Sequence, residues 1–106
     1  MFKCDVCCLL LNEEVDVCPR CGAKKEHIKK LEADQEKKVI AADRTNTLLA
    51  SLVRICDELK VVAEEGKEIN LDPGCYGVFT FTLDKLDEIK RYAKAEIEVH
   101  INRNKW

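Results

Sequence analysis

A mainly α-helical fold with short β-elements is predicted by three features of this 106-residue sequence. Four of its seven cysteines form two C-x-x-C pairs near the start of the chain. Apolar residues recur at helical spacing between residues 48 and 63, and again between residues 83 and 101. Together these patterns predict a small metal-bound ribbon followed by an α-helical hairpin.

The cysteine pairs, Cys4-x-x-Cys7 and Cys18-x-x-Cys21, are separated by ten residues. In a reducing compartment this spacing indicates metal ligation rather than disulfides. Each pair can form a knuckle, a tight turn that directs two sulfurs at one ion, and four thiolates suit zinc or a single iron. We therefore predict that residues 1–23 form a ribbon whose four cysteines bind one zinc ion, with one iron ion as the alternative.

The residues around these cysteines resemble a known family. The runs FKCDVC, from Phe2 to Cys7, and CPRCGAKK, from Cys18 to Lys25, look like the rubredoxin-like module of rubrerythrins and its zinc-ribbon relatives. The resemblance covers about residues 2–25 and implies a metal-ligand role for the four cysteines. Where the family's first knuckle continues with glycine and tyrosine, this chain has Cys8 and Leu9. A third thiol is therefore expected near the site.

Residues 24–38 are almost continuously charged and predict a solvated helical linker, because only Ile28 and Leu31 there are large and apolar. Residues 39–106 should form the helical hairpin. The first helix carries one apolar row at Leu48, Leu52, Ile55, Leu59 and Val62, and a neighbouring row at Leu49, Val53, Cys56 and Ala63. We expect Gly66 to end this helix and Cys56 to pack in the core as a small apolar residue.

A short β-element is predicted between the helices, at residues 67–82. Asp72-Pro73-Gly74 is typical of a turn, and residues 79–82 alternate apolar and polar side chains at the period of a strand. We expect strands at about 67–71 and 77–81, followed by a last helix that Thr82 caps and that runs to about Asn104. Its apolar row is Leu83, Leu86, Ile89, Ala93, Ile97 and Ile101.

The apolar rows of the first helix are together wider than one partner helix can cover. We therefore expect the helical region to mediate association, as a homodimer or with another protein. The favoured function is that of a small metal-binding protein with a structural Cys4 site. The alternative is a rubredoxin-like one-electron carrier with iron at the same four cysteines.

Composition argues against several other classes. Charged residues make up 36% of the chain, but the net charge is only -2, so nucleic-acid binding is not expected. No window approaches the roughly 20 apolar residues of a membrane span, and no signal sequence is visible, so a soluble cytoplasmic protein is expected.

The sequence shows no catalytic constellation. His100 follows Glu96 by one helical turn, but the paired Glu-x-x-His motifs of a di-iron site are absent. His27 is expected to be solvated in the charged linker. We therefore do not expect an enzyme, although an accessory redox role stays open, and Cys8 and Cys75 receive no assigned role.

Overall fold

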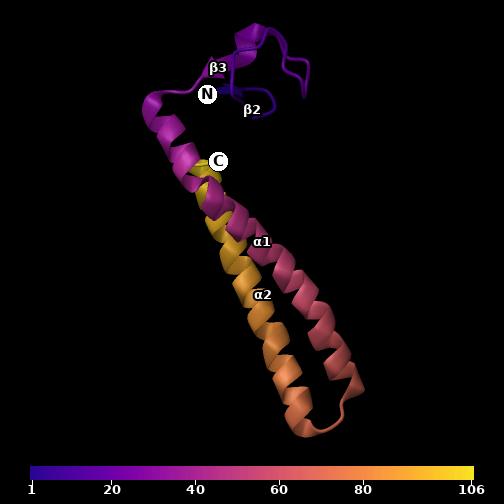
Figure 1. The fold of residues 1–106 in the computed structure, drawn as a ribbon. Helices are drawn as coiled ribbons and strands as arrows, with labels where there is room; N and C mark the ends of the chain where they lie inside the picture. The colour runs from indigo at the N-terminus through magenta and orange to yellow at the C-terminus, as the bar shows by residue number, and fades with distance from the viewer. The chain divides into compact units, whose positions relative to one another are not determined.

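The computed structural model describes residues 1–106, which divide into two compact units, Met1–Ile40 and Ala41–Trp106. The short elements are β1 (Phe2–Cys4), β2 (Leu10–Leu11), the 3-10 helix η1 (Lys25–His27) and β3 (Ile28–Lys30). Two long helices follow, α1 (Ala33–Ile69) and α2 (Pro73–Asn102), as the ribbon in Figure 1 shows. The prediction of a mainly helical fold with short strands is confirmed.

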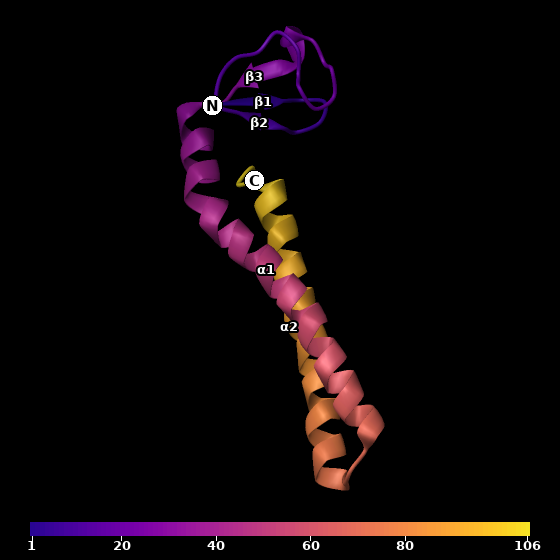
Figure 2. The same ribbon diagram turned by 45° about the vertical axis from the view of Figure 1, so that its right-hand side comes forward.

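The first unit contains a three-stranded antiparallel sheet in the order β2-β1-β3 (Figure 2). Phe2 pairs with Leu11 on one side of β1, and Cys4 pairs with Ile28 on the other. This register places Cys4 in the middle of the unit's core, which Cys18 and Ile28 complete. The sheet therefore positions the first cysteine pair.

The predicted helical linker at 24–38 is wrong in its first half, because residues 25–30 form η1 and β3. Ile28 is buried in the core of the first unit, whereas the two lysines after it are exposed. Ile28 and Leu31 are the two buried residues of the charged segment 24–38. The burial of Ile28 and the pairing of β3 with β1 hold the segment in the sheet instead of a solvated helix.

In the second unit, α1 and α2 run side by side in opposite directions (Figures 1 and 2). The buried side chains of α2 recur every seven residues, at Leu86, Ala93 and His100. Cys56 of α1 is buried, as predicted. A polar group lies in the same interface, where His100 Nδ1 is 2.6 Å from Asn46 Oδ1 and Asn46 Nδ2 donates to the Lys105 carbonyl at 2.9 Å.

The predicted β-element at residues 67–82 is wrong, because α1 continues to Ile69 and α2 begins at Pro73. Asp72 is the N-cap of α2, and its Oδ1 accepts a hydrogen bond from the Cys75 amide at 2.7 Å. Proline suits the first turn of a helix because its fixed φ is already helical. The Asp-Pro-Gly run therefore starts a helix, and Thr82, the predicted cap, lies inside α2.

Gly66 does not end α1 but lies buried within it. A Cβ atom at Gly66 would come within 2.3 Å of the Phe79 ring, so the missing side chain leaves room for that ring. The helix ends just before Asn70, whose φ of 47° is the left-handed conformation common at helix C-termini. Phe79 thus packs against α1 and is not part of a strand.

Candidate metal centre

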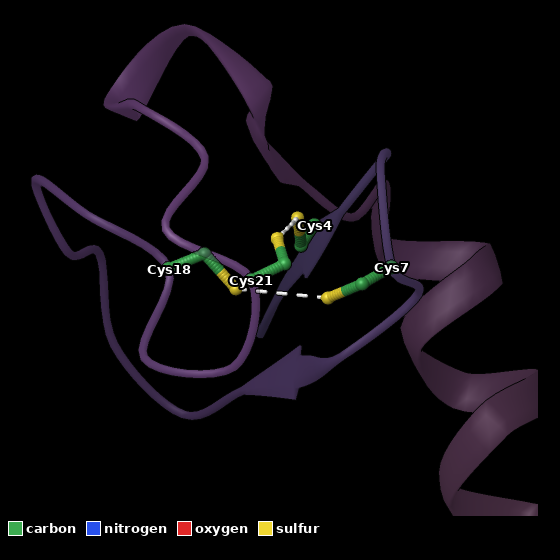
Figure 3. Close-up of side chains that lie close together, drawn as sticks. All are labelled: Cys4, Cys7, Cys18 and Cys21. Atoms are coloured by element: carbon green, nitrogen blue, oxygen red, sulfur yellow. Dashed lines mark hydrogen bonds between the residues drawn. The ribbon is translucent and has the colours of Figure 1, made fainter.

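The sulfur atoms of Cys4, Cys7, Cys18 and Cys21 lie within 4.8 Å of one another (Figure 3). The Cys4 and Cys21 sulfurs are 3.7 Å apart, as are those of Cys7 and Cys18. Thiolates about 2.3 Å from a tetrahedral zinc ion would be separated by about 3.8 Å, whereas a disulfide requires about 2.05 Å. The cluster can therefore hold a metal ion, and its spacing does not fit disulfides.

The two cysteine pairs share one backbone pattern. In each, the amide of the first cysteine donates to the carbonyl five residues later, and its carbonyl accepts from the amide four residues later. The four bonds measure 2.8 to 2.9 Å and run from Cys4 to Leu9, Cys8 to Cys4, Cys18 to Ala23 and Gly22 to Cys18. The site is thus assembled from two equivalent knuckles.

The residue that follows each pair adopts the left-handed conformation, with φ of 64° at Cys8 and 75° at Gly22. Glycine adopts this conformation without the steric penalty that a Cβ atom brings. Cys8, which replaces the glycine of the rubredoxin-like pattern, therefore lies where the backbone turns sharply. The Cys8 side chain is exposed and lies outside the four-sulfur group.

Polar contacts fix the knuckles to each other and to the chain that follows. Arg20 Nη1 donates to the Cys7 carbonyl at 2.7 Å, which links the second knuckle to the first. The Asp5 amide donates to the His27 carbonyl at 2.9 Å, and Asp5 Oδ1 lies 2.8 Å from His27 Nδ1. His27, expected to be solvated, is therefore a structural partner of the first knuckle, and no sequence signal marked this pairing.

The sulfurs differ in burial and in acidity. Cys4 and Cys18 are 0% and 1% exposed, whereas Cys21 is exposed. A hydrogen bond from the Cys21 backbone, aided by one from Arg20, lowers the pKa of the Cys18 thiol to about 6. At Cys21 a backbone hydrogen bond from Ala23 also favours the thiolate. Desolvation and the neighbouring thiols outweigh that bond and raise the Cys21 pKa to about 12.

The neighbouring thiols contribute to both shifts, because a thiolate at one sulfur disfavours a second negative charge less than 5 Å away. A cation bound among the four sulfurs would favour their thiolate forms. Four cysteine sulfurs at this spacing could hold a metal ion, which would supply that positive charge.

The remaining candidates do not form a second site. His100 Nε2 lies 3.3 Å from Glu96 Oε1, but the other ring nitrogen is occupied by Asn46. Cys75 Sγ lies 3.6 Å from Asp72 Oδ2, and this carboxylate raises the pKa of the thiol. Asn46 was not predicted to be part of the interface between the helices. Its position at helical spacing between Ala42 and Leu49 is the pattern that indicates this role.

Comparison with known proteins finds no relative of this chain: no family model, no curated protein and no solved structure matches it. No helix has the length and apolar character needed to cross a membrane.

Proposed function

We propose that Cys4, Cys7, Cys18 and Cys21 bind one zinc ion whose role is to fold the first unit. The observation that carries this proposal is that Cys4 and Cys18 are the largest fully buried side chains of the protein. Phe2, Leu9, Leu11 and Val15 pack around them only partly buried. So small an apolar core supplies little stability of its own, whereas zinc binding contributes directly to folding.

A four-coordinate thiolate site leaves no open position on the ion, so the proposed role is structural and not catalytic. The test compares Cys18→Ser with Cys56→Ser, since both cysteines are buried and only the first belongs to the cluster. Elemental analysis should find one ion per chain in the wild type and in Cys56→Ser, and strong loss in Cys18→Ser. Retention of a full ion by Cys18→Ser would refute the proposal.

The second candidate is one-electron transfer by iron at the same cysteines, as the rubredoxin-like resemblance of residues 2–25 suggests. It is favoured by the exposure of Cys21, which lines a shallow cavity of about 410 Å³ together with Val6 and Ala23. A ligand that reaches the surface gives an electron a short path to a partner. Protein purified from iron-replete cells in air should then be red and bleach on reduction, whereas a zinc protein is colourless.

We further propose that the helical unit mediates association. Its helices expose many large apolar side chains, including Leu48, Leu52, Val78, Phe81 and Tyr92, which are 41% to 73% exposed. Such surfaces on a small protein are typical of interaction sites.

A further inference from the structure

The exposed side of α1 carries an unbroken aliphatic row, here called the outer row: Leu48, Leu52, Ile55, Leu59 and Val62. Its members are spaced alternately by four and three residues and are 41% to 61% exposed. This is the spacing of a coiled-coil seam. A seam of five large aliphatic side chains without a charge among them is suited to packing against another helix.

That helix is not α2. The row of α1 that is buried or half-buried, the inner row, is smaller and more polar: Ala42, Asn46, Leu49, Val53, Cys56 and Ala63. Elsewhere the α1–α2 junction is charged at its surface, where Lys90 pairs with Asp57. The larger aliphatic seam of α1 therefore stays exposed within the hairpin.

Charges beside the outer row identify the partner. The positions that flank it at seven-residue steps are Arg44, Ser51, Glu58 and Glu65, all partly or fully exposed. If two copies of α1 cross antiparallel about an axis between Arg54 and Ile55, Arg44 of each faces Glu65 of the other and Ser51 faces Glu58. The same operation places Leu48 within one residue of Val62 of the other copy, and the two Ile55 residues within one residue of each other. In a parallel pair these positions would instead lie beside the other flank of the outer row, which carries Leu49, Cys56 and Ala63, so the charges would have no charged partner there.

We propose that the outer row binds a second copy of this chain, antiparallel, about a two-fold axis between Arg54 and Ile55. Two hairpins then close into a four-helix bundle whose centre is the outer row. This inference rests on the proposed role of the helical unit in association. It is independent of the metal proposal, because metal content is measured separately on every variant.

The first test is the mass of the full chain by sedimentation equilibrium from low micromolar to submillimolar concentration. A dimer is expected for the wild type, and a monomer is expected for Leu52→Asp/Leu59→Asp with unchanged metal content and helicity. Ile101→Asp is the matched control, because Ile101 is similarly exposed, at 51%, but lies outside the outer row on α2. A monomeric wild type, or an Ile101→Asp variant that dissociates equally, would overturn the proposal.

The second test uses surface charge alone and so avoids any loss of folding. Arg44→Glu places a carboxylate opposite Glu65 at two symmetric sites, and we expect the dissociation constant of the dimer to rise about tenfold at low salt. Glu65→Arg should have the same effect, and the double variant Arg44→Glu/Glu65→Arg should restore the wild-type constant. Equal dissociation constants for all four proteins would overturn the antiparallel arrangement.

Discussion

Cys8 adopts the left-handed backbone conformation. The equivalent residue of the other knuckle, Gly22, adopts the same conformation without a side chain. A residue with a Cβ atom in this region costs about 1–2 kcal/mol relative to glycine. Cys8→Gly should therefore stabilise the metal-loaded first unit by about 1 kcal/mol, and Gly22→Ala should destabilise it by a similar amount. Amide NMR during thermal unfolding measures both changes. Loss of metal from Cys8→Gly would instead make Cys8 a ligand.

The Asp72 carboxylate faces the Cys75 sulfur and raises the pKa of that thiol. Cys75 should therefore react slowly with iodoacetamide near neutral pH, because the thiolate is the reactive form. Asp72→Ser removes the charge but keeps an oxygen that can cap α2. We expect its alkylation curve at Cys75, followed by peptide mass spectrometry, to shift to lower pH. An unshifted curve would contradict the assigned cause.

The same carboxylate also makes the stability of α2 depend on pH. The backbone amide of Cys75, together with its thiol, lowers the pKa of Asp72 below its value in the unfolded chain. Because the pKa of Asp72 is lower in the folded protein, the stability that its carboxylate contributes is fully present above the pKa of the unfolded chain. This stability is lost as the pH falls through the pKa of the folded protein. Acid unfolding of the helical unit, followed by circular dichroism, should therefore be less pH-dependent in Asp72→Ser than in the wild type.

Asn46 has two hydrogen-bond partners at once, the buried His100 ring and the part-buried Lys105 carbonyl. Asn46→Ala removes both hydrogen bonds and leaves a buried imidazole without its partner at Nδ1. We expect a loss of about 1–3 kcal/mol in the free energy of unfolding. Thr47→Ala is the control on the next, exposed position of α1 and should change stability by less than about 0.5 kcal/mol. Equal effects of the two substitutions in urea unfolding would contradict this role.

The elements that the sequence predicted well are those with a long, regular pattern. The apolar rows between Leu48 and Val62 and between Leu83 and Ile101 lie on helices, because many positions support one period. The β-element failed because its signals are ambiguous. Asp72-Pro73 begins a turn or caps a helix equally well, and the alternation at Phe79 and Phe81 covers too few residues to exclude a helix.

The cysteine site was predicted by spacing alone, since two C-x-x-C pairs suffice to bring four sulfurs together. The contacts that hold the knuckles, such as Arg20 with the Cys7 carbonyl and Asp5 with His27, could not be predicted. They depend on the sheet register that places β3 beside β1, in which Cys4 pairs with Ile28, a buried residue within a charged run. Long-range partners of this kind leave no local pattern in the sequence.

For the whole molecule, the two units should respond differently to removal of the metal. The core of the first unit consists of Cys4, Cys18 and Ile28, so under the proposed function its folding should depend on the ion. The second unit buries its own side chains along α1 and α2 and has no part in the cluster. Chelation should therefore collapse the amide dispersion of residues 1–30 while the far-ultraviolet signal of the helices is largely kept.

The control for chelation is the readdition of one equivalent of zinc, which should restore the dispersed amide spectrum of the first unit. Chelation should lower the helicity of the Leu52→Asp/Leu59→Asp variant no more than it lowers that of the wild type. The reason is that the ion and the outer row act on different units. If chelation unfolded the helices together with the ribbon, the two cores would be thermodynamically coupled. The division of the chain into independently folding units would then be wrong, even with one metal ion bound per chain.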